Sequence, residues 1–141
     1  MSAKNTKHIR NGLYLIYCPI FFEEKKLESF RLYILNNLEH QYDINCTHFI
    51  KKTPLNTTRA TIKPLDFCEL GIISLEDCSH TQKIIIQANC DDNESFNAIK
   101  KVSPKKFFSP FENLPIINKS GIIVELYTIN KKKEEKNSSA S

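Results

Sequence analysis

The chain has 141 residues, a formal net charge of +4 and 40% hydrophobic residues. This length fits one domain, and the composition excludes wholesale disorder and large multidomain enzymes. No apolar run approaches the roughly 18 residues of a membrane span, so we expect no membrane segment. No small-residue cleavage site follows residues 13–22, so we expect no signal peptide either. We expect a basic lead over residues 1–11, a globular domain over 12–129 and a charged, solvated tail over 130–141.

Lysine, asparagine and isoleucine are in excess, with 17, 13 and 18 copies, while glycine and arginine each occur 3 times. This bias indicates an AT-rich genome, so part of the lysine excess follows from codon usage. The five cysteines form no Cys-x-x-Cys pair. We therefore expect reduced cysteines and a cytoplasmic protein, with a nuclear one as the alternative.

The first expected elements are a buried strand at 13–17 and an amphipathic helix at 23–39. Pro19 should end the strand or lie at an edge. Leu27, Phe30, Ile34 and Leu38 recur at helical spacing and would form the buried face of the helix.

The rest of the chain has mainly β texture. We expect strands at 42–51, 57–63, 70–75, 83–88 and 121–129, with Thr53-Pro54 as a break and 83–88 buried on both faces. Residues along 42–51 alternate, and one face of that strand would hold Tyr42, Ile44, Cys46, His48 and Ile50. A second, weaker helix is expected at 91–102, and a loop at 103–115. The fold class predicted from these elements is α+β, with a mainly antiparallel sheet or a small OB-like β-barrel and one amphipathic helix (23–39).

Charges are segregated along the chain. Residues 46–65 and 100–119 are each strongly basic, whereas residues 66–99 hold seven acids against Lys83. The segment 100–111 also interleaves lysines with phenylalanines and prolines. Cations that bind phosphates beside rings that stack bases are the chemistry that single-stranded nucleic acid requires.

We therefore predict a binding site for single-stranded nucleic acid with two walls. Its lysines and arginine would neutralise phosphates, and its phenylalanines would stack bases. The alternative is that these rings are buried anchors and the lysines ordinary surface. The predicted site residues are Lys51, Lys52, Arg59 and Lys63 on one wall, and Lys100, Lys101, Lys105, Lys106, Phe107, Phe108 and Phe111 on the other.

Two Cys-x-His pairs, Cys46/His48 and Cys78/His80, share one spacing. Placed on strands, each pair would point to one face, and together they could form a tetrahedral Cys2His2 zinc site. The alternative is two buried cysteines and two partly exposed histidines. No phosphate-binding glycine loop or two-histidine phosphoesterase motif occurs, so we expect no catalytic residues and no cofactor.

The order of strand 13–17, helix 23–39, Cys-Thr-His-Phe-Ile (46–50) and Gly-Ile-Ile-Ser-Leu-Glu-Asp-Cys (71–78) resembles a BRCT module over residues 12–80. The resemblance implies binding of a phosphopeptide or a DNA end. The function predicted from the residues is a non-enzymatic protein that binds single-stranded DNA in replication or genome maintenance. The alternative is a protein-interaction module, either BRCT-like or a small subunit of a replication or transcription complex. A homo-oligomer is also possible from sequence.

Overall fold

The computed structural model describes residues 9–23, 26–90, 95–114 and 116–128. Most of the expected N-terminal lead and all of the expected tail lie outside this range. The described residues form nine strands, a one-turn helix and a 3-10 helix. These elements are β1 (Gly12–Phe22), β2 (Lys26–Asn37), β3 (Tyr42–Ile50), β4 (Thr53–Ile62), β5 (Asp66–Ser74), α1 (Leu75–Cys78), β6 (Gln82–Asn89), β7 (Phe96–Val102), η2 (Pro104–Phe108), β8 (Glu112–Asn113) and β9 (Ser120–Thr128).

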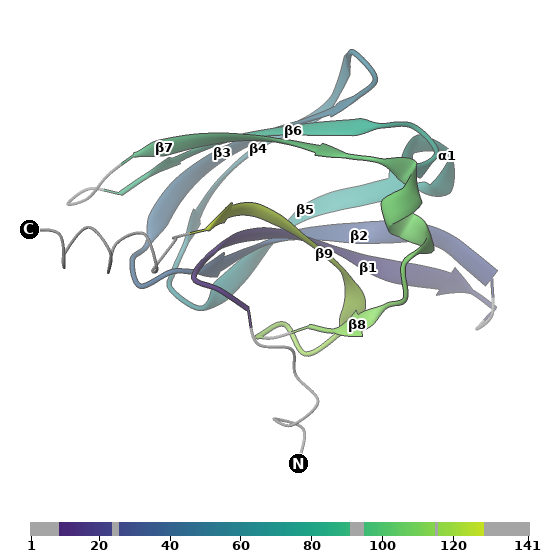
Figure 1. The fold of residues 1–141 in the computed structure, drawn as a ribbon, viewed down its shortest axis with the longest axis horizontal. Helices are drawn as coiled ribbons and strands as arrows, with labels where there is room; N and C mark the ends of the chain where they lie inside the picture. The colour runs from purple at the N-terminus through teal and green to yellow at the C-terminus, as the bar shows by residue number, and fades with distance from the viewer. Residues whose placement is uncertain (1–8, 24–25, 91–94, 115, 129–141) are drawn as a thin grey trace, which may run out of the picture.

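The strands form two antiparallel sheets that face each other (Figure 1). The five-stranded sheet has the order β5-β2-β1-β9-β8, and the four-stranded sheet has the order β4-β3-β6-β7. One hydrophobic core lies between them, with inward side chains from both sheets. The molecule is thus a β-sandwich, in which each sheet buries one face against the other.

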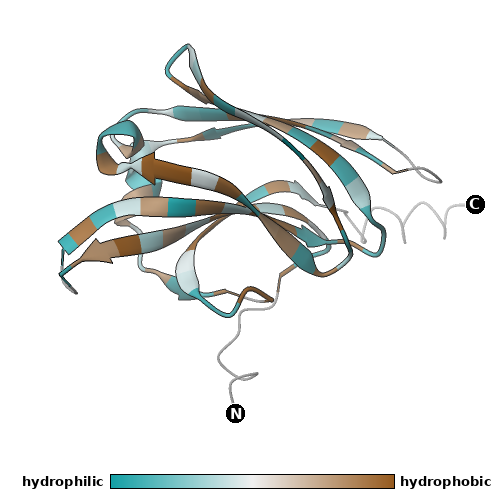
Figure 2. Cartoon of the chain, turned by 180° about the vertical axis from the view of Figure 1, so that it is seen from behind, coloured by the Kyte–Doolittle hydropathy of each residue, from teal (hydrophilic) through white to brown (hydrophobic). Residues whose placement is uncertain are grey.

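Alternation along β3 was predicted correctly. Tyr42, Ile44, Cys46, His48 and Ile50 are all buried, and the residues between them are more exposed. The same alternation appears in Figure 2 as hydrophobic and hydrophilic bands along the strands. β6 is a central strand as expected, but only its inward face is fully buried.

The predicted helix at 23–39 is wrong, because residues 26–37 form β2 in the middle of the five-stranded sheet. Phe30, Leu32 and Ile34 face the core between the sheets. Tyr33 and Leu35 face the other side, where a second cluster includes Leu114 and Ile117 of the loop before β9. A strand buried on both faces is apolar almost throughout, so helical spacing can be found in it by chance.

The predicted helix at 91–102 is also wrong over its described part. Residues 96–102 form β7, an edge strand paired with β6, while residues 91–94 lie outside the described range. Phe96 and Val102 pack inward together with Ala98. Their separations are even numbers, so the three side chains share one face of a strand.

These corrections change the fold class from α+β to nearly all β. The sheets remain two open layers over the described residues, so the expected OB-like barrel is wrong as well. The strand-helix-strand order that carried the BRCT resemblance is likewise absent, since a strand stands where that helix was expected.

The prolines in β1 and β4 and the glycine in β5 lie at positions where the strand pairing accommodates them. β1 pairs with β9 only as far as Tyr17, so Pro19 lies where β1 has β2 as its one neighbour, as an edge proline should. Thr53-Pro54 begins β4 instead of breaking a strand. Gly71 adopts a φ of 135° at the register shift between β5 and β2, a conformation that favours glycine.

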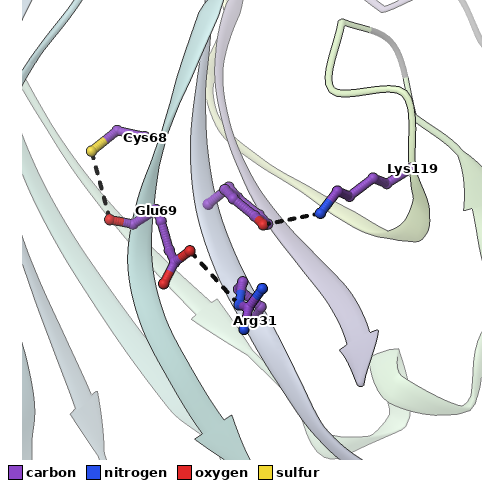
Figure 3. Close-up of polar contacts among 5 residues, drawn as sticks. Arg31, Cys68, Glu69 and Lys119 are labelled. Carbon is purple, nitrogen blue, oxygen red and sulfur yellow. Dashed lines mark hydrogen bonds and ion pairs between the residues drawn. The ribbon is translucent and has the colours of Figure 1, made fainter. Parts of the chain in front are cut away.

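The outer face of the five-stranded sheet carries polar contacts between neighbouring strands (Figure 3). Arg31 on β2 pairs with Glu69 on β5, with 3.7 Å from Nε to Oε1. Lys119, from the loop before β9, donates to the Tyr33 hydroxyl at 3.3 Å. This loop therefore covers part of that face. Within the described residues, no helix is long and apolar enough to cross a membrane.

Candidate nucleic-acid interface

A basic groove lies along the side of the sandwich where β7 and β9 are the facing strands. It encloses about 780 Å³. We call it the basic groove and define it by its charged lining residues. These are Arg10, Lys100, Lys101, Lys105 and Lys106, with Glu125 as the one carboxylate.

The 3-10 helix η2 positions two of these cations. Ser103 caps its start, with its hydroxyl accepting a hydrogen bond from the Lys105 amide at 3.2 Å, and Pro104 supplies the first-turn geometry. The Phe107 ring packs edge-on against Tyr17 at 4.9 Å and in a tilted orientation against Phe30 at 5.3 Å between centroids. With this anchor, η2 holds Lys105 and Lys106 at the groove.

The segment before β1 places Arg10 at the opposite wall. Its carbonyl accepts hydrogen bonds from the Tyr14 hydroxyl at 2.8 Å and from the Asn37 amide at 2.9 Å. Burial raises the pKa of Tyr14, and nearby Glu125 raises it further, so the phenol remains a neutral donor at neutral pH. Ring contacts of Phe107 thus fix one wall of the groove to the core, and hydrogen bonds to the Arg10 carbonyl fix the other wall to the five-stranded sheet.

The structure brings only part of the predicted site together. Lys100 and Lys101 on β7 and Lys105 and Lys106 on η2 meet in the basic groove. Arg59 and Lys63 belong to β4 and the turn after it, at the opposite edge of the four-stranded sheet. The two predicted walls therefore do not face each other.

Lys51 and Lys52 lie in the β3–β4 turn, at the same end of the sheet as Lys101. Between them, strand pairing aligns Phe49, Lys83 and Lys101 in one row across β3, β6 and β7. The Lys83 ammonium lies 5.7 Å from the centre of the Phe49 ring. This row carries positive charge from the β3–β4 turn to the rim of the basic groove.

The three predicted aromatic residues have different environments. Phe107 is partly buried and packs against the core, so its ring is engaged by Tyr17 and Phe30 in this conformation. Phe108 is 88% exposed and has open faces. Phe111 lies between these extremes and packs edge-on against Phe30.

The Cys-x-His residues fall in and around a buried polar cluster instead of a four-ligand site. Gln82 Oε1 accepts a hydrogen bond from the Tyr17 hydroxyl at 2.7 Å and lies 2.6 Å from His48 Nε2. With the amide oxygen as acceptor, the His48 ring donates from Nε2. Burial lowers the pKa of His48, which keeps the ring neutral.

Cys46 and Cys78 lie beside Tyr17 in the same cluster. Burial raises the thiol pKa to about 11 for Cys46 and about 12 for Cys78, with Asp77 adding to the latter. Reactive and metal-binding cysteines need an accessible thiolate, which these environments disfavour. Among the described residues, no three His, Cys, Asp or Glu side chains are grouped closely enough to hold a metal ion. His80 lies after α1, partly exposed.

Several residues of the interface were missed from sequence. Arg10 was assigned to the basic lead. Lys83 was left out of the site because it lies in the acidic segment 66–99. The exposed pair Phe21 and Phe22 at the end of β1 was counted only as the end of the apolar run 13–22. Only the period-two alternation of β6 could have indicated that Lys83 lies on an outer face.

Comparisons with known proteins add no relative. No protein-family model matches the chain, and no curated protein matches it. The function therefore has to be argued from the groove and its surroundings.

Proposed function

We propose that this protein binds single-stranded nucleic acid, with single-stranded DNA as the expected ligand, through the basic groove. The observation that carries the proposal is the gathering of five cations from three separate segments around one groove with a single carboxylate. None of its four lysines forms an ion pair with another described residue. Lysines without such an ion pair can neutralise phosphates and release the counterions that surround the nucleic acid.

The preference for single strands is supported by Phe108. Its ring follows Lys106 by two residues and is almost fully exposed. A stacked duplex offers no free base face along its sides, whereas an unpaired base can stack on such a ring for about 1–3 kcal/mol. Cations alone would bind both forms, so the ring supplies the discrimination.

The positions of two acids also favour the β7–β9 side as the binding side. Asp66 and Glu69 lie on β5, at the edge of the five-stranded sheet away from β9. Like charges near the groove would repel phosphates, and their placement at the far edge avoids this. Asp66 and Glu69 are therefore placed where they do not oppose a polyanion that approaches the β7–β9 side.

The test is fluorescence anisotropy with labelled single-stranded and duplex oligonucleotides at about 50 and about 200 mM salt. We expect the single strand to bind more tightly, with affinity falling steeply as salt rises. Lys105→Ala with Lys106→Ala should lower affinity about tenfold and reduce the slope of log K against log salt by roughly 1–2.

Arg59→Ala with Lys63→Ala is the matched control, because it removes the same charge from the opposite edge of the sheet. We expect its affinity to stay close to that of the wild type. Equal losses from both double variants would indicate attraction by net charge alone and contradict a groove-specific site. Absence of binding at low salt would remove the proposal altogether.

A second candidate function is docking of an extended protein segment. β9 pairs with β8 only at Ser120 and Gly121, so among the described strands its edge beyond Gly121 has no partner on the groove side. Such an edge can accept an added strand through its backbone. Co-purification of one fixed partner, without nucleic-acid binding, would favour this reading.

A further inference from the structure

We infer that the tip of the β1–β2 hairpin stacks unpaired bases of the strand that the basic groove binds. The inference rests on the proposed function and extends it to residues outside the groove. We call the surface the aromatic end and define it by Phe21, Phe22, Phe108 and Phe111.

The aromatic end gathers four exposed rings from two distant segments. Phe21 is 48% exposed, Phe22 54% and Phe111 37%, in addition to the nearly free Phe108. The Phe21 and Phe111 rings meet edge-on with 6.5 Å between centroids, which joins the hairpin tip to the segment after η2. Scattered exposed apolar residues are ordinary, but exposed rings from two distant segments that contact each other, as Phe21 and Phe111 do, mark an interaction surface.

The helix η2 connects this surface to the groove. Its lysines Lys105 and Lys106 line the groove, and Phe108 ends the same helix. In Figure 1, η2 descends between the two layers on the side where β1 ends. A nucleic-acid strand that leaves the groove along η2 therefore meets Phe108 first and then the rings of the hairpin tip.

Unpaired bases fit the aromatic end better than a lipid surface does. Membrane-binding tips combine apolar side chains with cations, whereas the charges beside Phe22 are mixed, because exposed Glu23 follows it and exposed Lys26 pairs with it across the hairpin. Bases are uncharged, present flat faces to phenylalanine rings and come attached to the phosphates that the groove attracts. The phosphate charge is thus matched in the groove and the base surface at the tip.

The test compares oligonucleotides of about 4 and about 16 nucleotides, the limits of typical site sizes for a single-strand binding domain. Phe21→Ala with Phe22→Ala should lower affinity about tenfold for the long oligonucleotide and leave the short one unchanged. The salt slope for the long oligonucleotide should stay the same, because no phosphate contact is lost. Thermal unfolding followed by circular dichroism should be unchanged, since both rings are exposed.

Leu65→Ala is the control, because Leu65 is 62% exposed at the opposite end of the five-stranded sheet. It should bind both oligonucleotides as the wild type does. If wild type binds and the phenylalanine variant binds equally well, the inference is wrong while the proposed function stands. Binding to anionic vesicles that is lost in the variant, with oligonucleotide affinity intact, would instead assign the aromatic end to a membrane. If wild type binds neither oligonucleotide, both fail.

Discussion

Gln82 shows how one buried side chain can organise several others. It has no exposed surface, and its carbonyl oxygen accepts hydrogen bonds from both the Tyr17 hydroxyl and the His48 ring. The two partners come from different sheets, so Gln82 ties the layers together where the core is polar. Its amide nitrogen has no hydrogen-bond partner within the described residues and lies in the region of the Cys78 thiol.

Gln82→Ala should lower the free energy of unfolding by about 3 kcal/mol, because two buried donors lose their acceptor and a cavity opens. The measurement is urea unfolding followed by circular dichroism. Gln87→Ala on the exposed face of the same strand is the control, and we expect a change of less than about 0.5 kcal/mol. Similar losses from both variants would show that the buried network contributes nothing specific.

The element η2 has two functions within five residues. Phe107 fixes it to the core, while Lys105, Lys106 and Phe108 face outward. From the sequence, both rings were expected to stack on bases. The ring contacts of Phe107 with Tyr17 and Phe30 separate the two roles.

Phe107→Ala should lower the free energy of unfolding by about 2–4 kcal/mol, through loss of core contacts. Phe108→Ala should leave stability within about 0.5 kcal/mol of wild type and weaken single-strand binding. Chemical unfolding and anisotropy on the same two proteins measure both effects. A stable Phe107→Ala protein with weakened binding would contradict the assignment of Phe107 to the core.

At the scale of the whole molecule, the described residues place five cations on the β7–β9 side and Asp66 and Glu69 on the β5 edge. The row Phe49, Lys83 and Lys101 extends the positive surface from the groove rim across the outer face of the four-stranded sheet. Lys51 and Lys52 lie beyond it, in the β3–β4 turn. A nucleic-acid strand longer than the groove can therefore continue across the outer face of the four-stranded sheet.

Lys83→Ala should reduce the salt slope for a long oligonucleotide by roughly 1 and weaken binding to all sequences equally, as expected for loss of one phosphate contact. Anisotropy over a salt series measures the slope. Lys63→Ala, at the opposite edge, should leave the slope unchanged. An unchanged slope in Lys83→Ala would confine the ligand to the groove.

The sequence by itself determined the local and compositional properties of this protein. Alternation identified β3 with its inward face, and the apolar runs identified the core of β1, β6 and β9, because a strand with one buried face repeats every two residues. The charged segments were also evident, since charge is a property of each residue.

Only the tertiary structure decided the rest. β2 became a strand because a loop and a second sheet cover its two faces, and no local pattern states that a segment will be covered twice. Lys100 and Arg59 were separated, and Lys105 and Arg10 were brought together, by the order of strands in the sheets. That order depends on long-range pairing, which residues distant in sequence settle only when the whole core is packed.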